Sequence, residues 1–434
     1  MKIWLLTIGE PVPIGAGSRD RLHRTGSFAR FLASCGHEVV WWTSAFDHFR
    51  KEHLAPEDAA IGEPGGLRIQ LLRGCGYRRN VSLARFFDHA QVARRFRMLS
   101  RSESVPDIIV SALPTVEMCL AAADYGARCG VPTVIDLRDM WPDVMAEVAP
   151  AWLRPSARMV LAPLFKQARR ACLSATALIG ITEDFVDWGL QRGRRSRSEL
   201  DRAFPFAYSA AVPNGEELRA AERFWDTKGV HANASELVVC YFGNVGLQLD
   251  LSHVIESARR LSASGRLVRF VLCGEGERLK EYRRAAIGIP NVLFPGWVNR
   301  AGIVSLMRRS SVGLDPLPER HDFLASLNNK AIEYLSAGLP IVSSPKRGVL
   351  CNMLEQEGCG VSYVSGDAGS LTECLAHLAA HREELRPMRA NALSLFCQKF
   401  SADVVYPAMA NHLTIIRETF LRDQLSHVEV LHGR

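Results

Sequence analysis

The chain alternates short apolar runs with longer stretches in which apolar residues recur every three or four positions. Runs of roughly four to eight apolar residues bounded by turn residues are typical of buried parallel strands, and the longer stretches are typical of amphipathic helices. The expected strands cover residues 2–8, 37–43, 66–72, 106–111, 132–136, 175–181, 236–242, 267–273, 291–296, 312–316 and 339–342. Strand and helix alternate through both halves, so the pattern predicts an α/β protein built on doubly wound parallel sheets.

The expected helices cover residues 19–35, 83–100, 152–172, 251–264, 278–286, 368–380, 382–398 and 402–421. A chain of 434 residues is too long for one ordinary domain and suits two. We place the boundary near residues 208–214. This gives a first domain over residues 1–207, a second over residues 208–400, and a terminal helix with a tail over residues 401–434.

Composition limits the class of protein. Apolar residues make up 47% of the chain, which is enough for two cores, but no apolar run approaches the ~18 residues that span a bilayer. Residues 1–8 are too short a run for a signal peptide. The 11 cysteines lack the paired spacing of a zinc site or a disulfide framework. We therefore expect a cytoplasmic protein with reduced thiols and no bound metal.

The net charge of +7 is unevenly distributed along the chain. Arginines and aromatic residues crowd residues 73–101, and the stretches 83–100 and 152–172 both read as basic amphipathic helices. Such helices are typical of proteins that lie on an anionic membrane surface, here the inner face of the cytoplasmic membrane. An ordinary solvated helix face gives the same pattern, and both interpretations stay open. No nucleic-acid partner is expected, since no binding module is present.

Chemically active residues follow the strand over residues 132–136. Asp136, Arg138, Asp139 and Trp141 stand within a run of eight residues that ends with a third aspartate. Open α/β sheets bind ligands at the carboxyl ends of their strands. This density of charge at that edge favours a functional role over a purely structural one.

Two other loops of the first half reach the same edge. Gly15 and Gly17 follow the first strand, either as a plain turn or as a loop whose N–H groups approach a phosphate. His48 and Lys51 follow the second strand and are candidates for the binding edge, although packing roles explain them equally well.

In the second half, the stretch over residues 326–344 predicts a loop, a short helix and a buried strand. Asn328 or Asn329 suits the N-cap, and Gly338 stands where a left-handed C-cap belongs. Glu333 is expected in the first turn, facing a cleft where its carboxylate accepts hydrogen bonds from two hydroxyls of a ribose, or else solvated on the helix surface.

Two glycine turns follow strands of the second half. The strand over residues 236–242 leads into Gly243, Asn244 and Gly246, and the next strand leads into Gly274 and Gly276. Glycines let the backbone approach a phosphate, and the helix N-terminus that follows the first turn offers partial positive charge. Both turns are therefore candidates for binding a phosphorylated ligand.

The pattern Lys330-x-x-Glu333-Tyr334-Leu335-x-x-Gly338-x-Pro340 resembles the donor segment of retaining glycosyltransferases of family 4, which have the GT-B fold. The run over residues 136–143 is similar to D-x-R-D-x-W-P-D in the subset that builds bacterial surface polysaccharides such as O-antigen, capsule and exopolysaccharide. The sequence departs from the family at two places. Ala325 stands where many members carry a first glutamate, and Asn244 and an uncharged stretch stand where they carry arginine and lysine.

The resemblance implies two Rossmann-like domains that face a cleft, with the C-terminal helix crossing back to the first domain. It implies a nucleotide diphosphate sugar, UDP-linked, as co-substrate. The donor residues would be Gly15, Gly17, Gly243, Asn244, Gly246, Gly274, Gly276, Trp297, Val298, Asn329, Lys330 and Glu333. Lys330 would bind the diphosphate, with Lys346 or Arg347 as alternates.

The same resemblance implies that the first domain binds the acceptor, a lipid-linked compound or a saccharide. Asp139 or Asp136 would orient the acceptor hydroxyl and help to take its proton, and Arg138 would keep a carboxylate ionised. His48, Lys51 and Trp141 would contact the acceptor. The residues expected to act in catalysis are Asp136, Arg138, Asp139, Lys330 and Glu333.

No Asp-x-Asp triplet occurs in the chain, so we expect a lysine and helix N-termini, without a metal, to stabilise the departing diphosphate. The predicted function is sugar transfer with retention at the anomeric carbon. Two alternatives stay open, a sugar-nucleotide 2-epimerase of the same fold and a non-catalytic subunit that holds a sugar nucleotide.

Overall fold

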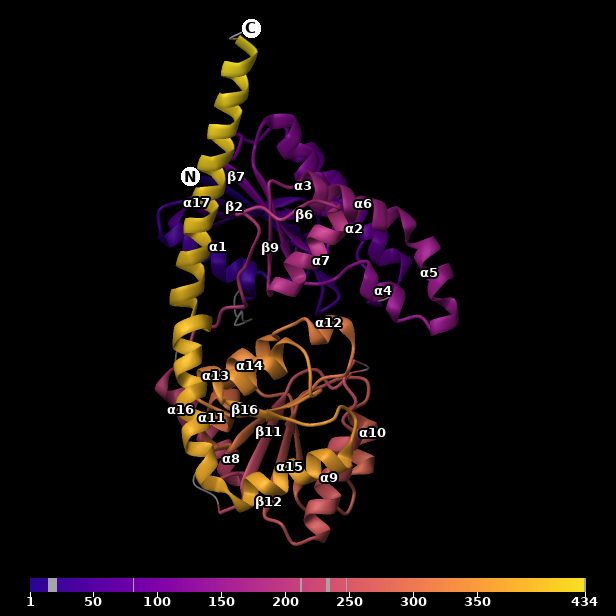
Figure 1. Ribbon diagram of the computed structural model, residues 1–434, viewed down its shortest axis with the longest axis vertical. Helices are drawn as coiled ribbons and strands as arrows, with labels where there is room; N and C mark the ends of the chain where they lie inside the picture. Colours follow the sequence, from indigo (N-terminus) through magenta and orange to yellow (C-terminus); the bar gives the residue numbers. More distant parts are fainter. Residues whose placement is uncertain (15–21, 81, 211–212, 232–234, 247, 433–434) are drawn as a thin grey trace. The chain divides into compact units, whose positions relative to one another are not determined.

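The computed structural model describes residues 1–434 except 15–21, 81, 211–212, 232–234, 247 and 433–434, and it describes no side chain beyond residue 426. The chain forms two compact units (Figure 1). One contains Met1–Phe204 and Tyr406–Arg434, and the other contains Pro205–Val405. We call them the N-terminal and the C-terminal unit. The predicted glycine loop at Gly15 and Gly17 lies outside the described residues.

The N-terminal unit is built on an eight-stranded sheet. Its strands are β1 (Lys2–Leu6), β2 (Glu38–Ser44), β5 (Ala59–Glu63), β6 (Leu67–Leu72), β7 (Ile108–Leu113), β8 (Thr133–Leu137), β9 (Ala177–Gly180) and β10 (Arg202–Ala203). Their order is β10-β9-β8-β7-β1-β2-β6-β5, and only β5 runs antiparallel to its neighbour. A short antiparallel pair, β3 (Phe46–Asp47) and β4 (Glu52–His53), follows β2. The sequence pattern missed β5 because its residues, Ala-Ala-Ile-Gly-Glu, include only one strong strand former.

The helices of this unit are α1 (Arg24–Ser34), α2 (Leu83–Leu99), α3 (Val116–Cys129), α4 (Asp143–Glu147), α5 (Arg154–Val160), α6 (Ala162–Ser174) and α7 (Glu183–Gly193), with 3-10 turns η1 (Pro64–Gly66) and η2 (Ala151–Leu153). The single helix predicted over residues 152–172 is wrong, because the chain breaks at Leu161. Pro163 has no N–H to donate and its ring would clash with the preceding turn of a continuous helix. A new helix therefore begins with Pro163 in its first turn.

An aromatic cluster fills the core beneath α2 and α3. Trp4 and Trp42 from neighbouring strands meet edge to face with ring centroids 5.2 Å apart, and Phe96 and Tyr125 pack against Trp4. All four side chains are buried. Each such aromatic pair stabilises the fold by about 0.5–1.5 kcal/mol beyond the contribution of its buried area. The cluster therefore holds α2 and α3 on the sheet.

The C-terminal unit contains a six-stranded sheet. Its strands are β11 (Leu237–Phe242), β12 (Val268–Cys273), β13 (Val292–Gly296), β14 (Val312–Pro316), β15 (Ile341–Ser344) and β16 (Gly360–Ser362). The order is β13-β12-β11-β14-β15-β16, and all recorded pairs are parallel. The prediction of two doubly wound, parallel-sheet domains is confirmed.

The helices of the C-terminal unit are α8 (Gly215–Thr227), α9 (Ser252–Ala263), α10 (Leu279–Ala285), α11 (Arg300–Arg309), α12 (His321–Leu324), α13 (Asn329–Ser336), α14 (Val349–Glu357), α15 (Ala368–Ala380) and α16 (Leu385–Leu395), with turns η3 (Arg382–Glu384) and η4 (Phe396–Phe400). The last helix, α17 (Ala402–His432), begins in this unit and belongs to the N-terminal unit from Tyr406 on. Among the described residues, no helix has both the length and the apolar character needed to cross a bilayer.

Each sheet reverses its strand order beside its first strand. In the N-terminal unit β2 and β7 flank β1, and in the C-terminal unit β12 and β14 flank β11. Ligands of open α/β sheets bind at the carboxyl ends of the strands beside such a reversal. The segments that follow β1, β7, β11 and β14 are therefore the places where a site is expected, and the segment after β8 lies one strand further along the sheet.

Candidate functional site

Two glycine turns brace each other at the carboxyl ends of β11 and β12. Gly243, Gly274 and Gly276 have φ values of 154°, 143° and 154°, which L side chains rarely adopt. A Cβ on Gly274 would lie 1.9 Å from the carbonyl oxygen of Gly243, so no other residue fits there. Val245 donates its N–H to the carbonyl of Glu275 at 2.8 Å. The two turns thus form one small backbone platform at the reversal point.

Helix α13 lies beside these two turns, and capping residues define both of its ends. Asn328 is its N-cap and accepts a hydrogen bond from the N–H of Ala331 at 2.9 Å, while Gly338 follows in the left-handed conformation with φ 59°. Because the helix begins at Asn329, Glu333 lies in its second turn, and the prediction that it lies in the first turn is wrong. Its side chain is nonetheless buried, with 6% of the residue exposed.

The helix is held on the sheet by Tyr334. Its hydroxyl lies 3.2 Å from the carbonyl of Cys240 and 3.1 Å from that of Leu314, so it bridges β11 and β14. Gly313 makes room for the ring, because a Cβ there would lie 2.5 Å from it. This fixes the position of every side chain on α13.

Lys330 and Asp315 form a buried ion pair at the end of β14. The ammonium lies 3.0 Å from the carboxylate, whose other oxygen accepts a hydrogen bond from the Asn328 amide at 2.6 Å. Asp315 is fully buried, and 13% of the Lys330 side chain is exposed. Burial opposes the charged ammonium, but Asp315 and Tyr241 outweigh it, so the pKa of Lys330 is raised above its ordinary value. The lysine is therefore a fixed cation at neutral pH.

Lys330 also lies beside the first glycine turn. Its ammonium sits 4.4 Å from the centroid of the Tyr241 ring, and the Tyr241 hydroxyl donates to the carbonyl of Asn244 at 2.9 Å. The structure therefore brings together Lys330, Gly243 and Asn244, and the prediction that they bind a phosphate stays a prediction.

Other predicted donor residues are less constrained. Trp297 follows β13 with 68% of its surface exposed, and Val298 is half-buried beside it. Asn329 is exposed at the first position of α13. Arg347, an alternate for binding the diphosphate, is exposed and paired with Glu319, and Lys346 is also exposed.

In the N-terminal unit, the end of β8 carries a buried ionic network. Asp136 is fully buried and accepts from Arg24 Nε at 3.0 Å and from Arg138 Nε at 2.7 Å. Arg138 is also paired with Glu10. Burial would raise the pKa of Asp136, but the two guanidinium groups outweigh it and hold the pKa below its usual value. The carboxylate is thus ionised and engaged by two arginines.

Glu10 links this network to the first helix. Its carboxylate accepts from the Thr25 N–H at 3.0 Å and from the Thr25 hydroxyl at 2.8 Å, in the first turn of α1. A carboxylate is favoured at a helix N-terminus for the same reason that a phosphate is. In this structure the N-terminus of α1 is occupied by the chain's own anion.

The remaining candidates gather around two aromatic rings. Lys51 lies over the Tyr77 ring at 4.8 Å, and His48 Nδ1 lies 2.6 Å from the Tyr77 hydroxyl. The Arg85 guanidinium lies over Trp141 at 4.5 Å and over Tyr77 at 5.6 Å. The structure therefore connects His48, Lys51 and Trp141 through Tyr77 and Arg85, neither of which the sequence singled out as a site residue.

Charged groups surround this cluster from the neighbouring helices. Arg85 interacts electrostatically with Asp139 and with Glu117 in the first turn of α3, while His89 Nδ1 lies 4.0 Å from Glu117. Burial, with Arg85, lowers the pKa of His89 to about 3, and burial with Lys51 and Arg85 lowers the pKa of His48 to about 4. Both imidazoles are therefore neutral at pH 7. The sequence signal that could have found Glu117 is its place in the first turn of the helix that follows the central strand β7.

Part of the chain matches a known protein family, and the fold matches solved structures. Residues 236–381, within the C-terminal unit, match the family described as Glycosyl transferases group 1. The search of curated proteins gave no match.

Solved structures match the whole chain. The Anabaena protein HepE in complex with UDP shares 15% identity at a TM-score of 0.62, covering 98% of this chain and 100% of its own. Sucrose-phosphate synthase from Thermosynechococcus elongatus shares 14% identity at a TM-score of 0.67, with 97% and 99% covered. WaaG, a glycosyltransferase involved in lipopolysaccharide biosynthesis, shares 15% identity at a TM-score of 0.63, with 95% and 100% covered. The fold is that of GT-B glycosyltransferases, and residues 236–381 of the C-terminal unit match the group 1 glycosyl transferase family.

Proposed function

We propose that this protein transfers a sugar from a nucleotide diphosphate sugar to an acceptor hydroxyl, with retention at the anomeric carbon. The observation that carries the proposal is the fixed cation of Lys330, held by Asp315 beside the glycine turn after β11 and three residues before the buried Glu333. A buried, permanently charged lysine beside a glycine turn suits a diphosphate, whose departure it would stabilise.

The donor roles follow from these positions. Lys330 and the turn over residues 243–246 bind the diphosphate, Glu333 binds the ribose, and Trp297 with Val298 contacts the nucleobase. We take UDP as the nucleotide, because HepE was crystallised with UDP and with UDP-glucose. The charge supplied by Lys330 makes a divalent metal unnecessary for leaving-group stabilisation in this proposal.

The acceptor roles fall to the N-terminal unit. Asp139 orients the acceptor hydroxyl, and the half-buried Arg85, held over the buried rings of Trp141 and Tyr77, offers a cation to a saccharide that carries an anionic group. Asp136 and Arg138 act as positioning residues, since the Asp136 carboxylate is enclosed by two arginines. The acceptor class we favour is a lipid-linked saccharide of a bacterial surface polysaccharide.

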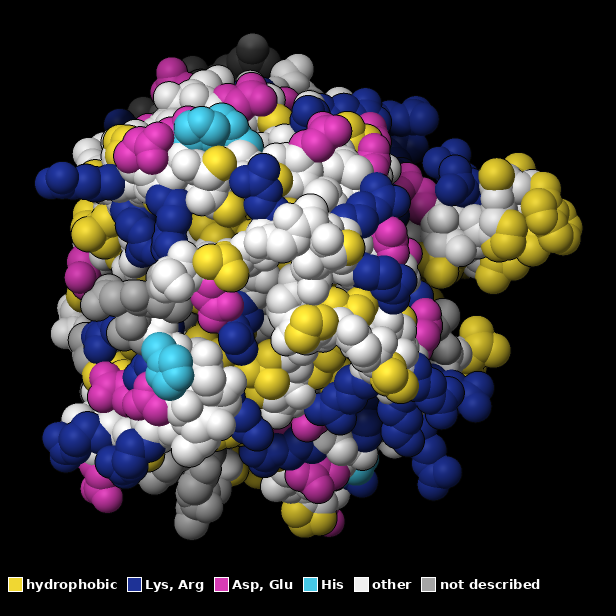
Figure 2. Space-filling model, turned by 90° about the horizontal axis from the view of Figure 1, so that it is seen from below, with side chains coloured by type: hydrophobic (Ala, Val, Ile, Leu, Met, Phe, Trp, Pro, Cys, Tyr) yellow, Lys and Arg dark blue, Asp and Glu magenta, His cyan; other side chains and the backbone are white. Residues whose placement is uncertain are grey.

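A lipid-linked acceptor requires a membrane contact, and the α5 protrusion, defined as residues 148–174, has the chemistry for one. It exposes Val148, Trp152, Met159 and Val160, each with 65–78% of its surface accessible. It also carries five cations and no carboxylate, namely Arg154, Arg158, Lys166, Arg169 and Arg170. Figure 2 shows hydrophobic side chains gathered at its end, with Lys and Arg side chains beside them.

Each cation near an anionic surface contributes about 1 kcal/mol, and the apolar end adds burial in the interface. Vesicle sedimentation tests this contact. We expect binding to vesicles of phosphatidylcholine with phosphatidylglycerol, weaker binding to phosphatidylcholine alone, and loss of binding in Trp152→Ser/Met159→Ser. Ile287→Ser, which removes an equally exposed apolar residue of the C-terminal unit, is the matched control. Equal binding by both variants would exclude the α5 protrusion as the contact.

Donor binding is tested first, and sugar transfer is tested with the donor so identified. A thermal-shift panel of nucleotide sugars should identify the donor, because a ligand at 100 times its Kd adds about 2.7 kcal/mol. Glu333→Gln and Lys330→Met should abolish that shift, whereas Glu319→Gln, an exposed carboxylate of the same unit, should not.

Incubating the identified donor with a lipid-linked saccharide should then give a product whose anomeric configuration, read by NMR, matches the donor. An inverted centre would contradict the mechanism. Conversion of the donor alone would favour the 2-epimerase instead. Donor binding without any turnover would favour a non-catalytic subunit, an interpretation to which Asn244 and the buried Ala325 give some support because family members carry charged residues there.

A further inference from the structure

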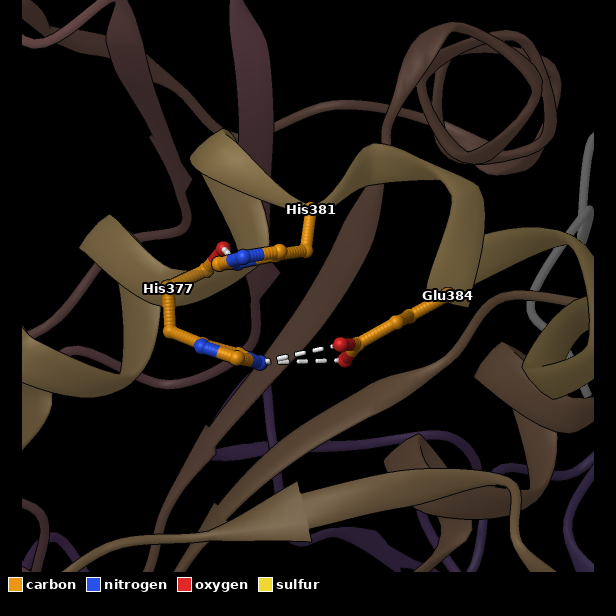
Figure 3. A group of neighbouring side chains, drawn as sticks. All are labelled: His377, His381 and Glu384. Carbon is orange, nitrogen blue, oxygen red and sulfur yellow. Dashed lines mark hydrogen bonds and ion pairs between the residues drawn. The ribbon is translucent and has the colours of Figure 1, made fainter.

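Three side chains that can act as metal ligands come together at the carboxyl end of α15 and the turn after it (Figure 3). His377 lies in the last turn of α15, His381 is the C-cap of that helix, and Glu384 lies on η3. Their candidate ligand atoms lie within 4.8 Å of one another. In the part of the chain that the structure describes, no other group of three His, Cys, Asp or Glu side chains converges in this way.

The spacing suits a tetrahedral cation. His377 Nε2 lies 3.1 Å from each oxygen of Glu384. Two ligand atoms at about 2.0–2.1 Å from a tetrahedral zinc are roughly 3.3–3.4 Å apart, so this pair already has nearly the required separation. The third ligand atom needs a shift of the order of 1 Å, which the exposed side chain of His381 makes by rotation about its own bonds.

The orientation of His381 provides the lone pair that a metal needs. Its Nδ1 lies 3.1 Å from the backbone carbonyl of His377, which only accepts hydrogen bonds, so Nδ1 carries the proton. Nε2 then has a free lone pair. Proteins usually orient a ligating histidine by a hydrogen bond from the ring nitrogen that does not bind the metal. The two imidazole rings also stack, with centroids 4.4 Å apart and planes 29° apart, so the two side chains lie in contact.

We propose that His377, His381 and Glu384 bind one divalent cation of the zinc type, with a water at the fourth position. Two imidazoles and a carboxylate are a ligand set that suits zinc, and imidazole also suits copper and nickel. The metal would replace the proton that His377 shares with Glu384, and would tie the end of α15 to the turn that starts α16.

The site acts on structure and not on sugar transfer. Arg382, between His381 and Glu384, donates to the carbonyl of Ser235 just before β11 begins. Lys330 and Gly243 lie beyond the other end of that strand, which at ~3.3 Å per residue is about 20 Å away. The bound metal would instead hold the start of α16 against the end of α15. Ala392 and Leu395 of α16 pack in the same buried cluster as Leu335 of α13.

Zinc and cobalt titrations of the full-length protein without a histidine tag test the site. We expect one zinc per chain, cobalt absorption bands typical of tetrahedral coordination, and at least tenfold weaker binding in His377→Gln, His381→Gln and Glu384→Gln. His231→Gln is the matched control, because His231 is exposed and paired only with Asp226 among the contacts described, at 3.5 Å. Zinc should also slow amide exchange over residues 377–390 in the wild type.

Absence of stoichiometric zinc binding, or equal affinity in the His381→Gln and His231→Gln proteins, would overturn the proposal. Because these variants are expected to keep nucleotide-sugar binding, loss of the metal site is distinguishable from failure of the transfer function.

Discussion

Replacing Asp315 by asparagine would remove the counter-charge of Lys330 and leave the shape of the site nearly unchanged. Asp315 is fully buried, and its two oxygens bind the Lys330 ammonium at 3.0 Å and the Asn328 amide at 2.6 Å. The substitution therefore isolates the electrostatic part of the interaction. Without the carboxylate, burial would dominate, and the pKa of Lys330 should fall below its ordinary value instead of lying above it.

The expected cost is large. Removing one partner of a buried ion pair destabilises a protein by about 3–5 kcal/mol, because the other charge stays buried without compensation. The 13% exposure of the Lys330 side chain and the amide oxygen of the new asparagine both lessen that cost, so we expect about 2–3 kcal/mol. Glu319→Gln breaks an exposed pair with Arg347 in the same unit and should cost no more than about 1 kcal/mol.

A double-mutant cycle measures the effect. Asp315→Asn, Lys330→Met and the double variant are compared by hydrogen exchange over β14 and α13, which reports on this unit and not on the other. We expect the double variant to be more stable than Asp315→Asn, with a coupling of roughly 1–3 kcal/mol between the two positions. Additive effects, or a cost of Asp315→Asn no greater than that of Glu319→Gln, would refute the idea that the carboxylate holds the lysine charged.

Three further changes test other parts of the molecule. Gly313→Ala should strongly lower the thermal stability of the C-terminal unit, since its Cβ would lie 2.5 Å from the Tyr334 ring, whereas Gly62→Ala, with nothing within 4 Å, should be tolerated. Lowering the pH from about 6.5 to about 4 should destabilise the N-terminal unit in urea, because the pKa of His48 is about 4 in the fold and the unfolded chain binds a proton first; His48→Gln should flatten that slope. Asp136→Asn should cost about 3–5 kcal/mol in urea unfolding, because it removes the carboxylate that faces the buried Arg24, while Arg138 keeps its pair with Glu10.

Patterns that depend on neighbouring residues were readable from the sequence. Asn328, Lys330 and Gly338 lie within one short stretch, and cap, helix and left-handed glycine follow from local rules. The same reasoning, that polar residues at strand ends face ligands, pointed to Asp136. The same reasoning applies to Asp315, the last residue but one of the strand over residues 312–316, which the sequence pattern did not single out.

Partnerships between distant residues were not readable. Arg24 and Asp136 are 112 positions apart, and they meet only because the strands β1 and β8 belong to one sheet and α1 follows the first of them. Tyr77 and Arg85 looked like members of a basic stretch, and only the fold shows that their side chains connect Lys51 to Trp141. Periodicity also hid the break before Pro163, because apolar spacing continues across it.

Helix α17 has a consequence for how the protein is made. Its later part completes the N-terminal unit: Tyr406 packs on Phe28 with ring centroids 5.6 Å apart, His412 contacts the carbonyl of Leu200, and Arg417 pairs with Asp107. These residues are synthesised about 200 positions after Phe204, where the first stretch of that unit ends. That stretch therefore cannot finish folding until α17 has been made, and a fragment stopping at residue 204 should expose an apolar seam and aggregate.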